Sequence, residues 1–208
     1  MSLTVRGAHL RPATAAIEAR PFAGEMPAWP AFALPGAPNR QPAHLAPKAE
    51  GAVAPPPGQV GRYTKSFNYS GPGAYIAHVE TGAQNGRNAY VDADSPFRDL
   101  PAALLGADWT QLVNRDALYH AVDLMEMTVT AGTSVFVAHD DRLPRPPWLE
   151  RQKFAATGES LTVLGRKLTL FRRDFPAEAG ITFGPNTEDM SAKEGAMYLV
   201  FVQGPAVK

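Results

Sequence analysis

Proline decides where this chain can form regular structure. Between Met1 and Gly58 a proline recurs every few residues, and the run Pro55-Pro56-Pro57 ends the segment. Proline lacks the amide hydrogen that helices and sheets use, and its ring clashes inside a helix. Residues 1–58 are therefore predicted to form an extended Pro/Ala-rich arm, with room for about two helical turns over residues 13–20.

The arm also carries large apolar side chains, which a free tail would expose to water. If these side chains are anchors, the arm lies on a protein surface, either that of its own domain or that of a partner. The alternative is a disordered leader with incidental apolar residues. The predicted partner-binding residues of the arm are Phe22, Met26, Trp29, Phe32 and Leu34.

Residues 59–208 are predicted to form one all-β domain. Short runs rich in β-branched and aromatic residues are separated there by Gly, Pro, Asn and Asp, the pattern of strands and turns. No alternation of strands with long helical segments is present, which argues against a parallel α/β fold. We expect an antiparallel, jelly-roll-like β-sandwich with one or two short helices, near residues 100–105 and 147–152.

The expected strands are short, and two tight turns are expected at residues 130–133 and 163–166. The run MYLVFV at residues 197–202 is apolar on both faces, so the last strand is predicted to be central and buried. The expected strands cover residues 62–69, 74–80, 89–93, 112–113, 121–130, 134–139, 160–163, 167–173, 180–183 and 197–203.

Charge and cysteine content restrict the partners. The 20 basic and 20 acidic residues give a formal net charge of zero, so no overall field draws the protein to nucleic acid. Without cysteine there is no disulfide or thiolate ligand. No stretch reaches the roughly 20 apolar residues of a membrane span, and the opening MSLTVRGAHL lacks the apolar segment of a signal peptide. We expect no cofactor, no nucleic-acid partner and no membrane span.

Catalytic and metal-binding motifs are also missing from the predicted domain. The sequence contains no Gly-x-Ser-x-Gly nucleophile motif, and its acidic residues are scattered near turns, so we expect no enzyme activity. His78, His120 and His139 have no metal-binding spacing, and no metal site is assigned. They could bind a metal by meeting in space, which keeps a small His-ligated metalloprotein as a third hypothesis. The alternative is that each histidine is a hydrogen-bonded structural residue.

The most distinctive segment is HDDRLPRPPWL at residues 139–149, which leads from a strand through a polar turn into a proline-initiated helix. In one interpretation its polar residues and tryptophan line a ligand-binding rim. In the other, the aspartates cap turn amides, the arginine pairs with one of them, and the tryptophan covers the core edge. The predicted rim residues are Trp109, His139, Asp140, Asp141, Arg142 and Trp148.

Aromatic side chains could also form a platform for sugar rings, whose C–H faces pack on flat aromatic surfaces. The alternative places these aromatics in the core of the sandwich. The candidates besides the tryptophans are Tyr63, Tyr69, Tyr75, Tyr90 and Tyr119.

Four segments within residues 73–202 carry a resemblance to a known class of domain. They are LLGADWTQLVN at 104–114, TSVFVAHDDR at 133–142, PWL at 147–149, and FRRDFP at 171–176 followed by a Gly-Pro-Asn turn. Their order resembles that of the β-sandwich accessory domains of secreted bacterial polysaccharide-degrading enzymes. The resemblance implies a non-catalytic domain in an extracytoplasmic setting, periplasmic or secreted, with an affinity for polysaccharide.

These observations lead to two main hypotheses, ahead of the metalloprotein hypothesis. The leading hypothesis is a binding or assembly subunit that docks on a larger extracytoplasmic protein complex through its sandwich and its arm. The alternative is a carbohydrate-binding module whose ligand surface includes the predicted rim. Because one fold serves many functions, the fold cannot decide between them.

Overall fold

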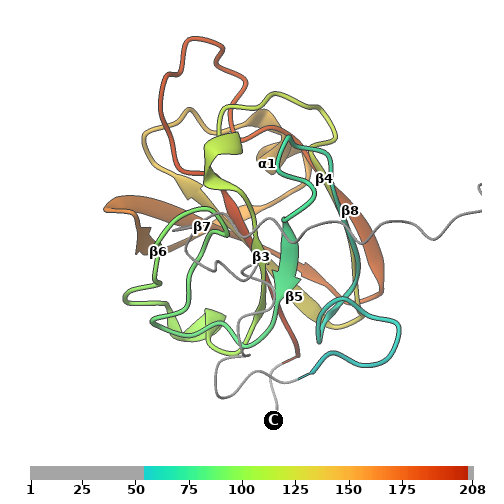
Figure 1. Cartoon of the computed structure of the whole chain (residues 1–208). Helices are drawn as coiled ribbons and strands as arrows, with labels where there is room; N and C mark the ends of the chain where they lie inside the picture. Colours follow the sequence, from blue (N-terminus) through green and yellow to red (C-terminus); the bar gives the residue numbers. More distant parts are fainter. Residues whose placement is uncertain (1–53, 206–208) are drawn as a thin grey trace, which may run out of the picture. The chain divides into compact units, whose positions relative to one another are not determined.

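The computed structural model describes residues 54–205. The predicted arm contacts of Phe22, Met26, Trp29, Phe32 and Leu34 lie outside the described residues and stay predictions, as does the domain boundary at residue 58. The described part of the chain is a β-sandwich of two antiparallel sheets, which confirms the predicted fold class (Figure 1). Within residues 54–205, no helix combines the length and the apolar character needed to cross a bilayer.

The two sheets differ in size. The smaller one has the order β1 (Thr64–Tyr69), β4 (Met125–Val129) and β8 (Ala179–Phe183). The larger one has the order β2 (His78–Glu80), β3 (Asp108–Gln111), β9 (Leu199–Gln203), β5 (Thr133–Asp140), β7 (Arg166–Phe175) and β6 (Ala155–Val163). The helical elements are α1 (Pro147–Arg151) and the 3-10 turns η2 (Ala102–Leu104) and η3 (Asn114–Asp116).

Strand β9 lies inside the larger sheet, between β3 and β5, as its apolar sequence predicted. Val200 and Val202 pair with Val137 and Val135 of β5, and all four valines are buried. Paired residues share a face of a sheet, so these valines form one apolar layer that packs toward the smaller sheet.

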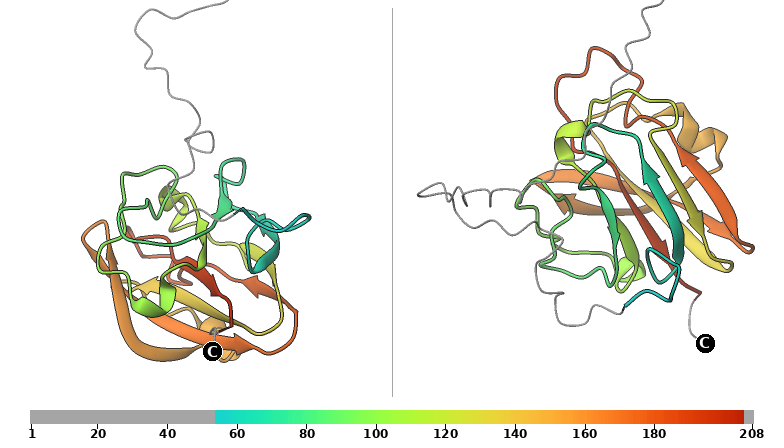
Figure 2. Two further views of the ribbon diagram at one scale, coloured as in Figure 1. Left: turned by 90° about the horizontal axis from the view of Figure 1, so that it is seen from below. Right: turned by 45° about the vertical axis from the view of Figure 1, so that its right-hand side comes forward.

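The opposite face of β9 is covered by the long connection between β2 and β3, residues 81–107. Phe97 of this connection packs on Trp109 and Phe201, with ring centroids 5.7 and 5.6 Å apart, and Leu104 is fully buried beside them. Figure 2 shows this green connection and the smaller sheet on opposite sides of the red β9. The connection also reaches β6, where Arg98 makes an isolated bridge with Thr162. Among residues 54–205, it leaves open the part of this face where β5 begins and β7 ends.

Some predicted strands were wrong in extent. Only His78–Glu80 of residues 74–80 are strand, because the preceding residues form turns around Gly73, whose amide donates to Asp116 Oδ2 at 2.8 Å. Residues 89–93 make only an isolated bridge, between Tyr90 and Leu112. The strand expected at residues 112–113 lies earlier, at Asp108–Gln111.

Candidate binding groove

The structure divides the six predicted rim residues between core and surface. Asp141 and Arg142 are exposed and remain predicted contact residues. The other four are buried, at 1, 3, 0 and 4% exposure for Trp109, His139, Asp140 and Trp148.

Two of the buried rim residues bind the segment that leads into β9. His139 Nε2 donates to the carbonyl of Asn186, and Trp148 Nε1 donates to the carbonyl of Pro185, each at 2.8 Å. Burial lowers the pKa of His139, which keeps its ring neutral. These contacts explain why the two side chains point into the molecule.

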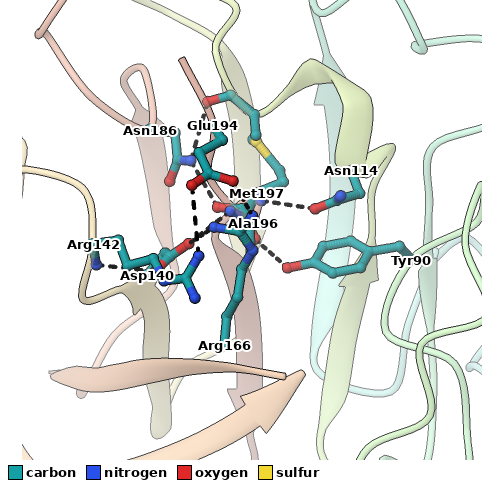
Figure 3. A network of polar contacts seen from close by, with 10 residues as sticks. Tyr90, Asn114, Asp140, Arg142, Arg166, Asn186, Glu194, Ala196 and Met197 are labelled. Atoms are coloured by element: carbon teal, nitrogen blue, oxygen red, sulfur yellow. Dashed lines mark hydrogen bonds and ion pairs between the residues drawn. The ribbon is translucent and has the colours of Figure 1, made fainter. Parts of the chain in front are cut away.

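Asp140 lies at the centre of a buried polar network (Figure 3). Its carboxylate accepts from the amides of Ala196 and Arg142, at 2.8 and 3.0 Å, and lies 3.4 Å from Arg166 Nη1. Arg166 also donates to Glu194 at 3.1 Å. The network fixes the segment before β9 against the end of β5.

The other two candidate histidines, His78 and His120, have different surroundings from His139. His78 is bonded to the carbonyl of Ile76 at 2.8 Å and to Glu80 at 3.1 Å, and the hydrogen bond to Glu80 raises its pKa. His120 lines a small hollow near α1. In the described part of the chain, no group of three or more histidine or acidic side chains is placed to hold a metal ion.

A more open site lies on the part of the larger sheet that the 81–107 connection does not cover. A hollow of about 780 Å³ lies where β5 begins and where β7 and β9 end. A second hollow, of about 620 Å³, shares Ala103, Phe136, Arg172 and Asp174 with the first. We call the two hollows together the sheet groove.

Strand register brings the floor of the sheet groove together. Ser134 of β5 lies opposite Asp174 of β7 and Gln203 of β9, and Phe136 lies opposite Arg172. These residues therefore share one face of the sheet, the face opposite the buried valine layer.

Three groups of the floor form a closed polar cluster. Ser134 Oγ and Arg172 Nε both donate to Asp174 Oδ1, at 2.7 and 2.8 Å, and Arg172 Nη2 donates to Ser134 Oγ at 3.0 Å. The guanidinium carbon of Arg172 lies 5.5 Å from the ring centroid of Phe136. The hydrogen bond from Ser134 lowers the pKa of Asp174, which favours its ionised form.

A buried carboxylate on β3 positions one wall of the sheet groove. Asp108 accepts from the amides of Arg62 and Tyr63, at 3.0 and 2.7 Å, and from Thr64 Oγ1 at 3.1 Å. Burial raises the pKa of Asp108 although these hydrogen bonds oppose the shift. Arg62 and Tyr63 line the larger hollow, and half-exposed Leu105 lines it from the 81–107 connection.

Sequence reasoning selected Tyr63 as a platform candidate but missed Phe136, Arg172 and Asp174. A signal for them was present in residues 171–175, FRRDF, where an alternating strand places Arg172 and Asp174 on the same face. Nothing in the sequence shows that this face is the uncovered one.

The comparisons with known proteins match the sandwich to a small part of a larger enzyme. No family model matches the chain. A β-glucuronidase of Formosa agariphila is 28% identical over 139 residues, which are 67% of this chain and 14% of that protein. A solved β-glucuronidase from glycoside hydrolase family 2 has 28% identity and a TM-score of 0.63 over 66% of this chain and 14% of its own. The sandwich thus resembles a β-region that is a small part of a glycoside hydrolase.

Proposed function

We propose that the sandwich is a non-catalytic accessory domain that binds carbohydrate, and that the sheet groove is its sugar site. The observation that carries the proposal is the groove itself, in which the aromatic ring of Tyr63 lines the same hollow as the fixed polar cluster of Arg172, Asp174 and Ser134. Sugars need this combination, because their C–H faces pack on rings and their hydroxyl groups need oriented partners.

The similarity to a glycoside hydrolase supports the proposal. The matched region is 14% of that enzyme, a length suited to one accessory module rather than to the whole protein. A module that attaches such an enzyme to its polymer works where the polymer is, which favours an extracytoplasmic setting, periplasmic or secreted.

Affinity electrophoresis of the full chain through gels containing a panel of polysaccharides tests the proposal. We expect at least one glycan to retard the protein, and Tyr63→Ala to weaken that retardation by about fivefold to tenfold, through lost stacking. Tyr75→Ala is the matched control, since Tyr75 is 79% exposed and does not line the groove. If every glycan left the mobility unchanged, the proposed function would be wrong.

A second candidate function is docking on a larger protein assembly. Its support is a strongly exposed apolar side chain, Val122, at 88% exposure on the rim of a hollow of about 270 Å³ that Trp148 and Pro185 also line. A partner that covered Val122 and filled this hollow would remove its apolar surface from water. Val122→Asp should weaken capture of a partner from the native source without changing glycan retardation.

A further inference from the structure

We infer that the sheet groove selects acidic saccharides, and that Arg172 recognises their carboxylate or sulfate groups. This inference rests on the proposed carbohydrate function and adds the chemical class of the ligand.

The charge of the sheet groove is the first observation. Its lining includes three cationic side chains and two acidic ones: Arg62, Lys153, Arg172, Glu159 and Asp174. One of the two acids, Asp174, is already paired with Arg172. The whole chain has a formal net charge of zero, so the excess of positive charge belongs to this site and not to the protein at large.

The remaining cations have no carboxylate partners of their own. Within residues 54–205, no acidic side chain lies within ion-pair distance of Arg62 or Lys153. Arg62 lies over the ring of Tyr63 at 5.1 Å. No carboxylate of the described residues therefore neutralises these charges, and an anion in the groove would be attracted to them.

The geometry of Arg172 is the second observation. Its Nε and one hydrogen of Nη2 are engaged by Asp174 and Ser134, and its plane lies over Phe136. No described residue accepts a hydrogen bond from its Nη1 atom, and the side chain is 48% exposed and lines both hollows. A guanidinium held in place binds an oxyanion with little further loss of side-chain entropy, and its fork matches two oxygens of one carboxylate or sulfate.

The test compares glycans of different charge by affinity electrophoresis and isothermal titration of the full chain. The probes are polygalacturonate and alginate for carboxylates, dextran sulfate for sulfate esters, and dextran as the neutral polymer. We expect at least one acidic polymer to bind about tenfold or more tightly than dextran, and the better acidic class identifies which oxyanion the groove takes.

Substitutions then test whether the binding of acidic polymers depends on Arg172. Arg172→Gln should lower the affinity for the acidic polymer at least about tenfold, by removing charge-assisted hydrogen bonds. The matched control is Arg115→Gln, because Arg115 is a 65% exposed arginine that belongs neither to the predicted rim nor to the lining of the groove. Should Arg172→Gln fail to fold, Arg62→Gln should still reduce acidic binding severalfold.

The outcomes distinguish a failure of the acidic-saccharide inference from a failure of the proposed carbohydrate function. Equal binding of dextran and the acidic polymers would overturn the inference and leave the carbohydrate function in place. Equal losses in the Arg172 and Arg115 variants would overturn it too, since they would indicate non-specific attraction. No binding to any polymer would remove the proposed function itself.

Discussion

Asp140 is a fully buried carboxylate whose amide and arginine partners include groups far away in the sequence. Replacing it with alanine leaves the amide of Ala196 without an acceptor and Arg166 with only Glu194. We expect Asp140→Ala to lower the free energy of unfolding by about 3 kcal/mol, measured by urea denaturation. Asp141→Ala is the control, because Asp141 is exposed, and it should change stability by less than about 0.5 kcal/mol. Equal effects of the two changes would contradict the assigned role of Asp140.

The neutral, buried ring of His139 makes stability depend on pH. Burial lowers its pKa in the folded protein below the ordinary 6.5, so the unfolded chain binds more protons in mildly acidic solution. The contribution of this residue is therefore complete above about pH 6.5 and is lost as the pH falls below that value.

We expect His139→Gln to reduce the loss of unfolding free energy between pH 7.5 and pH 5.5, measured by denaturation at both values. His78→Gln should act in the opposite sense. The pKa of His78 is raised in the folded protein. The stabilising effect of His78 is therefore present below pH 6.5 and is lost as the pH rises through the folded pKa. Identical pH profiles for wild type and the His139 variant would rule out this account.

The residues around Asp140 show what the sequence could and could not predict at this scale. A polar turn followed by a proline-initiated helix was readable, because both depend on neighbouring residues. The contact between Asp140 and Ala196 joins residues 56 positions apart, and no local pattern encodes it. For the same reason the sequence could not show that Trp109 and Trp148 are buried.

The turn between β6 and β7 is an element that the sequence predicted correctly. Val163 pairs with Arg166, and the two residues between them, Leu164 and Gly165, have φ angles of 53° and 67°. Left-handed backbone suits glycine and asparagine and is strained for leucine.

Leu164→Asn should therefore raise the unfolding free energy by about 0.5 to 1 kcal/mol, seen as a higher melting temperature. Gly165→Ala should lower it by about 1 kcal/mol, because alanine gains a side chain at a positive φ. Leu164 is partly exposed, so loss of its packing will not mask the gain. A decrease in melting temperature for Leu164→Asn would contradict this interpretation of the turn.

The residue types at positions 130–133 predict a turn, but they do not show which strands pair on either side of it. It joins β4 to β5 as predicted, yet these strands belong to different sheets. Thr133 pairs instead with Phe175, so the turn is a crossing between layers and not a hairpin. Short turns of both kinds use the same small residues, and the choice depends on which distant strands compete for the edge.

At the scale of the whole molecule, the sandwich should fold without the arm. In the described region, the apolar side chains of the hydrophobic core form one cluster, whose members run in sequence from Tyr69 to Val202. We expect deletion of residues 1–58 to change the melting temperature by only a few degrees, measured by circular dichroism.

The same deletion tests the predicted arm function. If Phe22, Met26, Trp29, Phe32 and Leu34 anchor the arm on a partner, a pull-down from the native source should recover that partner with the full chain and not with residues 59–208. Unchanged recovery would show that the arm does not hold the partner.

The sheet groove also belongs to this scale, because its parts come from four segments of the chain. Tyr63, Ala103, Phe136 and Arg172 meet only after β5, β7 and β9 have paired and the 81–107 connection has covered its part of the sheet. The sequence predicted a sandwich, and it predicted β9 as central, because both follow from local hydrophobic patterns. The groove could not be predicted, because it depends on which part of a face stays open.

The central place of β9 has a consequence for how the protein is made. All other described strands precede β9 in the chain, and it lies between β3 and β5 in the larger sheet. Until the ribosome has released residues 199–203, β2 and β3 cannot join β5, β7 and β6, and β3 and β5 each have an unpaired edge. Such edges pair readily with other chains. The newly synthesised protein is therefore most prone to aggregate just before this strand is released, and a β9 peptide added in trans should protect a chain that ends before it.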